Sequence, residues 1–377
     1  SRLSQKNNLK ETTKTLLAET LPVEISILLA DYKYNERDGI KICEVQQLIL
    51  SKLSGYDFLY EGSGLVAEKV CDFLSPYQDA IWFVEKDICD HTFRAKFKNR
   101  GWIPLKRIDE LSDNPMYKQR AALPVQDPHD VRDYHGILYA RPSSIGSYSK
   151  FRQDCPGIII LDAKTFPYWV DKYKMSVLFS KNQELTKFKP QWGLYPKKYS
   201  KNLAGSIIDD IGGEVFVIKP RSSFKGNGII IAERKELDPI LRVILGEKQN
   251  LSKNPDSSLS YWESDPSDSF LVEEFVASDP ISVPHLDDQP YDGTLRSIFT
   301  LLYHKKELEM NILETHWKLP KKSLAEEGSW SEKHKSSGGR IPHYSKVEPA
   351  LREKVEERLK EAMLLFYRQI RENKLPP

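Results

Sequence analysis

Two lysines and two glycines within residues 214–231 form the pattern with the clearest chemistry in this chain. Gly226 and Gly228 would let backbone N–H groups approach an anion closely, and Lys219 and Lys225 would add positive charge. The apolar runs 215–218 and 229–231 on either side predict two buried strands. The stretch has neither the Gly-Lys-Ser/Thr of a Walker loop nor the spacing of a Rossmann turn. It therefore indicates either a phosphate-binding hairpin or a plain β-hairpin with a basic turn.

A second pattern, Glu309-Met-Asn311, has the residue types and spacing of a divalent metal site. Residues two apart on a strand point the same way, so these two side chains can share one ion. Mg²⁺ takes such oxygen ligands, with few from protein and the rest from phosphates and water. The alternative is an ordinary half-exposed strand.

Strand-like segments connect the two patterns in a recognisable order. Residues 267–276 contain the paired carboxylates Glu273 and Glu274, residues 291–302 open with Asp292 and Arg296, and residues 308–313 return as a hairpin partner. This order resembles the ATP-grasp superfamily: lysine strand, glycine-rich loop, acidic hinge strand, arginine strand, then Glu-x-Asn. The resemblance covers roughly residues 175–320. It implies an ATP-grasp fold that binds ATP and Mg²⁺.

The resemblance also gives roles to individual residues. Arg296 would neutralise charge on the transferred phosphoryl group, and Lys318 could do similar work or be a surface lysine. Glu309 and Asn311 would hold Mg²⁺ against the nucleotide phosphates. The residues expected to contact the nucleotide are Lys181 (or Lys187 in its place), Lys219, Lys225, Gly226, Gly228, Glu273 and Phe275.

The sequence departs from the family pattern at two places. The family usually carries a metal-binding acid shortly after the arginine, whereas Ser297 and Ile298 stand there in this chain. Asp292 is the nearest acid and is the third candidate metal ligand. The family often places Pro-Gly after the asparagine, and here residues 312–315 read Ile-Leu-Glu-Thr. Both departures bear on catalysis more than on the fold.

A further hairpin is predicted near the front of the chain, over residues 25–31 and 40–46. Asp31, Glu44 and Gln46 could hold an ion there, as in circularly permuted ATP-grasp enzymes. Because a Glu-x-Asn pair already stands in its usual place, we expect the front hairpin to be structural.

Substrate binding is predicted for residues 138–152, which are rich in arginine and serine. Arg141 and Arg152, with Ser143 and Ser144, could hold a carboxylate or phosphate through guanidinium and hydroxyl donors. A plain loop with two surface arginines fits the same residues.

Composition limits the classes of function. At 377 residues, with 29% charged and 40% hydrophobic residues, the chain is typical of a soluble protein with two or three domains. A net charge of +2 gives no reason to expect nucleic acid or membrane partners. No apolar run approaches a bilayer span and no signal peptide is evident, so we expect a cytoplasmic protein. Cys43, Cys71, Cys89 and Cys155 lack metal-site spacing and are predicted to be reduced thiols.

The predicted fold class is α/β (α+β), with an ATP-grasp fold preceded by an α/β substrate-binding domain. Residues 1–54 would form an N-terminal helix and the structural hairpin, and residues 55–170 the α/β block with a mostly parallel sheet. Residues 171–377 would form the nucleotide-binding domain and end in a packing helix. The composition of residues 112–141 indicates a long loop or a domain edge, and residues 165–174 are predicted to form a helix.

The leading hypothesis is an ATP- and Mg²⁺-dependent ligase. The γ-phosphate would pass to a carboxylate of a small-molecule or peptide substrate, and an amine would capture the acyl phosphate to form an amide. One alternative is an ATP-grasp kinase that phosphorylates a hydroxyl, which would need a dense basic cluster such as the lysines between Lys318 and Arg340. The other is a catalytically silent nucleotide-binding protein, which the missing acid after Arg296 favours.

Overall fold

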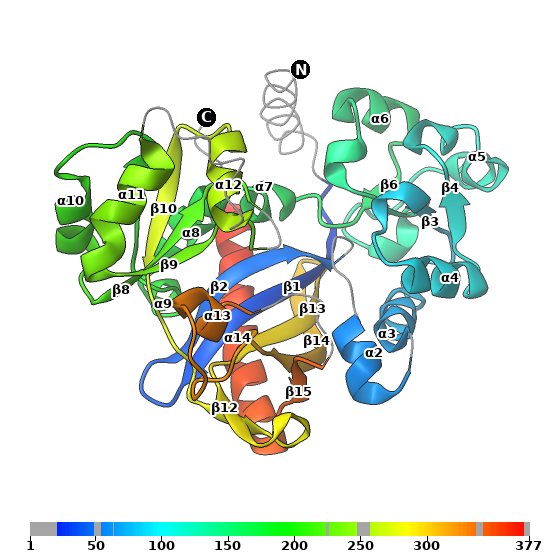
Figure 1. Ribbon diagram of the computed structural model, residues 1–377. Helices are drawn as coiled ribbons and strands as arrows, with labels where there is room; N and C mark the ends of the chain where they lie inside the picture. The colour runs from blue at the N-terminus through cyan, green and yellow to red at the C-terminus, as the bar shows by residue number, and fades with distance from the viewer. Residues whose placement is uncertain are drawn as a thin grey trace.

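The computed structural model describes residues 21–48, 54–62, 64–223, 226–246, 257–336 and 342–372. Within them the chain forms a mixed α/β structure with one five-stranded sheet, two four-stranded sheets and a two-stranded ribbon (Figure 1). The helix expected over residues 9–20 lies outside the described residues. No helix within the described ranges is both long and apolar enough to cross a bilayer.

The five-stranded sheet is antiparallel throughout and runs in the order β15-β14-β13-β1-β2. On one face of its strand β1, Leu28 and Tyr32 join the apolar core that contains α14 (Figure 1). On the other face, Ile25 and Leu29 pack against the parallel sheet. The bounds are β1 (Glu24–Asn35), β2 (Gly39–Gln47), β13 (Thr294–His304), β14 (Glu307–Lys318), β15 (Tyr344–Lys346) and α14 (Pro349–Glu372).

The front hairpin, β1 and β2, belongs to the same sheet as the C-terminal strands. Asp31 of β1 lies opposite Glu44 on one side and opposite Arg296 of β13 on the other. A domain boundary after residue 54 therefore separates strands of a single sheet. The hairpin places its acids beside the arginine strand, although the two segments lie far apart in the sequence.

The four-stranded antiparallel sheet contains the lysine strand and has the order β7-β10-β8-β9. Phe216 and Ile218 of β8 point into an apolar core with α10 and α11, so Val217 and Lys219 point to the opposite face. The predicted hairpin over 215–218 and 229–231 is confirmed as β8 and β9. The bounds are β7 (Trp192–Pro196), β8 (Val215–Pro220), β9 (Ile230–Glu233), β10 (Ser269–Glu274), α10 (Leu203–Ile211), α11 (Leu237–Leu245) and α12 (Ser257–Ser264).

The parallel sheet has the order β4-β3-β5-β6, and its strands lie within residues 55–170, where a mostly parallel sheet was expected. Strand β5 lies within residues 112–141, where we expected a loop; its four buried residues are too few to show a period beside a long polar stretch. The bounds are β3 (Ile81–Val84), β4 (Ile103–Leu105), β5 (Gly136–Tyr139), β6 (Ile158–Ile160), α3 (Leu65–Leu74), α4 (His91–Asn99), α5 (Pro115–Ala121) and α6 (Tyr148–Asp154).

The helix expected over residues 165–174 is instead two helices, α7 (Phe166–Trp169) and α8 (Lys172–Ser180). Asp171 ends the first and caps the second, because its side chain accepts hydrogen bonds from the N–H groups of Tyr173 and Lys174. The break turns Lys172 toward the interior. The remaining elements are short: α2 (Ser54–Tyr60), α9 (Gln183–Thr186), α13 (Trp330–His334), β11 (Ile281–Val283) and β12 (Gln289–Tyr291).

Candidate active site

A cavity of about 740 Å³ lies between the five-stranded sheet and the four-stranded antiparallel sheet, and it reaches the loops that follow β3 and β5. This volume lies within the range of pockets that bind cofactors and small molecules. Charged side chains from both sheets line it, among them Asp31, Glu44, Lys219, Glu273, Arg296 and Lys318.

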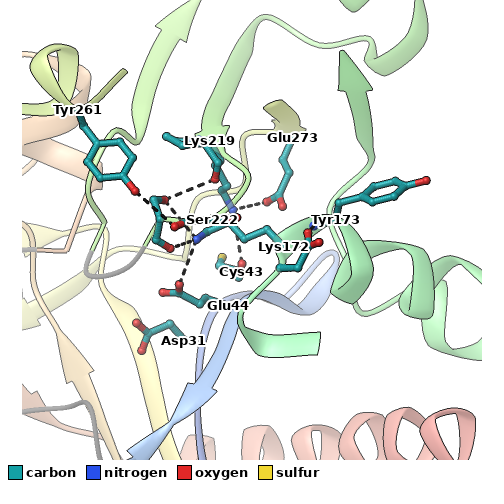
Figure 2. Close-up of polar contacts among 12 residues, drawn as sticks. Asp31, Cys43, Glu44, Lys172, Tyr173, Lys219, Ser222, Tyr261 and Glu273 are labelled. Atoms are coloured by element: carbon teal, nitrogen blue, oxygen red, sulfur yellow. Dashed lines mark hydrogen bonds and ion pairs between the residues drawn. The ribbon is translucent and has the colours of Figure 1, made fainter. Parts of the chain in front are cut away.

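Glu273 sits between two buried lysines at one wall of the cavity. Its carboxylate oxygens lie 2.5 Å from Nζ of Lys219 and 2.6 Å from Nζ of Lys189, and all three side chains are almost fully buried. Burial alone would raise the pKa of Glu273, but the two lysines outweigh it and lower that pKa. Burial also lowers the pKa of Lys189, although Glu273 opposes the effect. Figure 2 shows Lys219 directed toward Glu273 and toward the backbone of Cys43, whose carbonyl is 3.5 Å from Nζ.

An apolar slot adjoins these charges. Val217 and Ile231 from the four-stranded antiparallel sheet and Phe275, just beyond the end of β10, line the cavity. In the described part of the chain, the N–H of Val276 has no hydrogen-bond partner. Val276 also lines the cavity, so apolar side chains and a backbone donor lie together there, a combination that suits a heterocyclic base.

Asp31, Arg296 and Lys318 form a second charged group, on the five-stranded sheet. Asp31 accepts hydrogen bonds of 2.7 Å from both Nε and Nη2 of Arg296, and a third of 3.1 Å from Nζ of Lys318. Burial would raise the pKa of Asp31, but Arg296 and then Lys318 outweigh it and hold this pKa below its usual value. Both cations therefore stand in fixed positions at the cavity wall.

Glu44 and Gln46 continue this wall along β2. Nζ of Lys172 lies 3.6 Å from Glu44 (Figure 2). It also donates to Oγ of Ser223, so Lys172 links β2 to the turn after β8. Among the described residues, no group of three His, Cys, Asp or Glu side chains could hold a metal ion. The oxygens of Glu44 and Gln46 still fit Mg²⁺, because this ion commonly takes one or two carboxylates and completes its shell with phosphates and water. Both oxygens of Asp31 already accept hydrogen bonds from Arg296 and Lys318.

The glycine-rich turn follows the lysine strand, β8, and reaches the cavity at Gly226. Gly226 and Gly228 have φ values of +71° and +72°, which residues other than glycine rarely adopt. A Cβ on Gly228 would meet Pro220 at 2.5 Å and Tyr261 at 2.7 Å, so the turn needs glycine there. Gly226 lines the cavity beside Lys335. Lys225 lies outside the described residues.

The structure brings together many but not all of the predicted nucleotide contacts. Lys219, Gly226, Glu273, Phe275, Arg296 and Lys318 line one cavity, whereas Gly228 shapes the turn without lining it. Lys181 is exposed at the end of α8, and the alternative, Lys187, is exposed and pairs with Glu361 at 2.8 Å. The lysine that lies beside Lys219 is instead Lys189, which shares Glu273 with it but does not line the cavity. Its sequence signal was a lone lysine between apolar residues in Phe188-Lys-Pro190, which parallels Ile218-Lys-Pro220.

The three predicted metal ligands do not meet at the cavity. Glu309 and Asn311 are exposed and lie opposite Leu302 and Thr300 of β13. Leu302 is six residues from Arg296 along the strand, or about 20 Å at the rise of a β-strand. The prediction that Glu309 and Asn311 bind the metal against the nucleotide is therefore corrected: they share a face of the sheet with Arg296 but sit near its opposite end.

Asp292 is also unsuited to bind the metal. It is buried, and its carboxylate accepts hydrogen bonds from Nζ of Lys33 at 2.8 Å and from the N–H of Ser278 at 2.7 Å. Its second oxygen lies 2.7 Å from Nδ1 of His334. Asp292 precedes β13 and connects Lys33 of β1 to His334 of α13, and it does not line the cavity.

The predicted substrate residues divide into two pairs. Arg141 and Ser143 line the cavity. Ser144 instead donates to Asp87 at 2.8 Å, and Arg152 bonds the carbonyl of Ile158 and stacks over Phe151. The cavity therefore involves one of the two arginines.

No protein-family model matches the chain, and no curated protein is similar to it in sequence. Among solved structures, the fold is similar to the biotin carboxylase domain of 2-oxoglutarate carboxylase from Hydrogenobacter thermophilus, in a complex with MgADP, ADP and bicarbonate. The two chains share 10% identity with a TM-score of 0.31, and the match covers 67% of this chain and 62% of that one.

Proposed function

We propose that the protein is an ATP- and Mg²⁺-dependent ligase that activates a substrate carboxylate as an acyl phosphate and joins it to an amine. The observation that carries the proposal is the facing arrangement of paired cations: Lys219 on one sheet, and Arg296 with Lys318 on the other, around one cavity. Phosphoryl transfer needs mainly positioning and neutralisation of negative charge, which such an arrangement supplies.

Each part of the cavity suits a part of this reaction. The slot of Val217, Ile231 and Phe275 would take adenine, with the Val276 N–H facing its edge. Lys219 would contact the phosphates from one sheet. From the other, Arg296 would face the transferred group in the orientation that Asp31 imposes through two hydrogen bonds.

The metal would be held on the front hairpin rather than on β14. Glu44 and Gln46 would supply oxygen ligands at the cavity wall, while Asp31 beside them stays engaged with Arg296 and Lys318. When bound, Mg²⁺ would neutralise phosphate charge. This assignment agrees with the circularly permuted arrangement that the sequence left as an alternative.

The proposed reaction has two steps. A carboxylate oxygen of the substrate attacks the γ-phosphorus of ATP, and the bond to the β-phosphate oxygen breaks to release ADP. The amine then attacks the acyl carbon, loses a proton and expels inorganic phosphate. Arg296 and Lys318 are placed to stabilise the charge of the first step.

The kinase alternative has less support in the described residues. It expected a dense basic cluster after Lys318, but Lys321 and Lys322 lie 3.4 and 3.3 Å from Glu332 and neither lines the cavity. Within the described part of that segment, one lysine, Lys335, lines the cavity, together with His334.

A trapping experiment tests the proposal. The protein would be incubated with Mg-ATP, a panel of amino acids and small peptides, and hydroxylamine. A ligase should release ADP and yield a hydroxamate, because hydroxylamine captures an acyl phosphate. ADP release with a stable phosphomonoester and no hydroxamate would contradict the ligase and support the kinase. Nucleotide binding without ADP release across the panel would support a silent binding protein.

A further inference from the structure

The parallel sheet changes the direction of its connections between β3 and β5. In the order β4-β3-β5-β6, the chain leaves β3 toward one edge and leaves β5 toward the other. Open α/β sheets bind ligands beyond the carboxyl ends of their strands at such a switch point. Here the loops that leave these two strands contribute Cys89, Arg141 and Ser143 to the cavity.

A buried acid ties the two loops together and fixes Arg141. Asp87 accepts hydrogen bonds from the Arg141 N–H at 2.9 Å and from Oγ of Ser144 at 2.8 Å. Nε of Arg141 donates to the Asp87 carbonyl at 3.1 Å, and Nη2 lies 3.1 Å from Sγ of Cys89. The guanidinium is therefore held at the cavity wall before any ligand arrives.

The contacts of Arg141 leave its charge without an opposite partner. Among the described residues, no carboxylate lies within 4.0 Å of its guanidinium nitrogens, since its side-chain partners are a carbonyl and a thiol. Other cations of the cavity are paired: Lys219 with Glu273, and Arg296 with Asp31. A fixed, half-buried cation that faces a cavity without a counter-charge is suited to bind an anion.

We propose that Arg141, with Ser143 beside it, binds a carboxylate group of the substrate. The inference rests on the proposed function, because it takes the cavity to be the active site, and it defines the substrate as a carboxylate-bearing molecule recognised at the β3–β5 switch point. One guanidinium and one hydroxyl suit a monoanionic carboxylate. A phosphate dianion would call for a second cation beside Arg141. The paired cations Lys219 and Arg296 lie elsewhere, on the two antiparallel sheets.

Two cysteines in the cavity report on its two ends. Cys89 touches Arg141, whereas the carbonyl of Cys43 lies beside Lys219 at the proposed nucleotide end. Alkylation by iodoacetamide would be followed at each cysteine by peptide mass spectrometry, with the buried Cys71 and Cys155 as internal references. The probes are acetate, succinate and L-glutamate at matched ionic strength, inorganic phosphate, and Mg-ADP.

Carboxylates should slow alkylation of Cys89, and Mg-ADP should slow alkylation of Cys43. Arg141→Gln should weaken carboxylate protection of Cys89 about tenfold or more, as expected for the loss of one charge-assisted contact, and leave Mg-ADP protection of Cys43 intact. The matched control is Arg107→Gln, which changes an exposed arginine of the same block that pairs with Asp109. It should leave both protections unchanged.

The outcomes separate the inference from the proposed function. Protection of Cys89 by phosphate but by none of the carboxylates would overturn the substrate class. No protection of Cys89 by any anion, or equal protection in Arg141→Gln, would overturn the site, even if Mg-ADP protects Cys43. Failure of Mg-ADP to protect Cys43, with Cys89 protected by carboxylates, would reject the nucleotide site and leave an anion site at Arg141.

Discussion

Asp31 holds Arg296 through two hydrogen bonds of 2.7 Å across the pairing of β1 with β13. The pair is buried, and Lys318 adds a third contact to the same carboxylate. Through this contact, a residue near the start of the chain fixes the orientation of the residue proposed to neutralise the transferred phosphoryl group.

Asp31→Asn should therefore destabilise the fold as well as impair turnover. It leaves the charges of Arg296 and Lys318 buried without a carboxylate, which typically costs about 3–5 kcal/mol. The double variant Asp31→Asn/Arg296→Met removes one stranded charge, so its loss of stability should be smaller than the sum of the two single losses. Urea unfolding would measure all three variants. Additive losses would show that the two side chains do not stabilise each other.

The metal site can be tested by comparing two glutamates on the same sheet. Glu44→Gln should raise the Mg²⁺ concentration needed for half-maximal ADP release about tenfold or more, because it removes a carboxylate ligand. Glu309→Gln should leave the Mg²⁺ dependence unchanged, since Glu309 is exposed near the other end of the sheet. The reverse pattern would restore the metal site that the sequence indicated on β14.

The nucleotide end has a matched pair of lysines. Lys219→Ala should lower the affinity for Mg-ATP about tenfold or more through the loss of a charge-assisted contact. Lys181→Ala should have little effect, because Lys181 is exposed at the end of α8 and does not line the cavity. Calorimetry with a non-hydrolysable ATP analogue would measure both. An unchanged affinity in Lys219→Ala would reject the nucleotide site, provided that its thermal melt shows a folded protein.

The sequence was most informative where structure depends on neighbouring residues. The apolar run 215–218 predicted a buried strand, and β8 forms there. Phe216 and Ile218 enter an apolar core, whereas the opposite face, with Val217 and Lys219, lines the cavity. The glycines of the following turn were identified as positions that need backbone freedom, and both have positive φ. These features depend on periods and turns of a few residues.

The predicted metal ligands show what a local sequence pattern does not determine. Glu309 and Asn311 do lie on the same face of β14, as their spacing predicted, but their position along the sheet depends on which strands pair and in what register. The pairing of β1 with β13 decides which acids meet Arg296, and it joins the two ends of the chain. No local period encodes this pairing. The Glu-x-Asn pair was therefore preferred as the metal site and the front hairpin was interpreted as structural, although it supplies Asp31 and Glu44 to the cavity.

A buried carboxyl at the start of β1 should make stability depend on pH. Burial raises the pKa of Glu24 from 4.5 to about 7, against the opposing effect of Lys164. The folded state then keeps a proton that the unfolded state loses, so stability is full below pH 4.5 and falls as pH rises to about 7. A shift of this size corresponds to roughly 3 kcal/mol.

Glu24→Gln should remove most of that loss, because the amide stays neutral while its oxygen can still accept from Ser26 and from the Lys164 N–H. Thermal melts from pH 5 to 8 should show a smaller fall for Glu24→Gln than for the wild type, and the variant should be the more stable protein at pH 8. Glu309→Gln, an exposed change on the same sheet, should follow the wild type at every pH. Parallel curves for the wild type and Glu24→Gln would mean that Glu24 is ionised in the folded protein, with Lys164 outweighing the effect of burial.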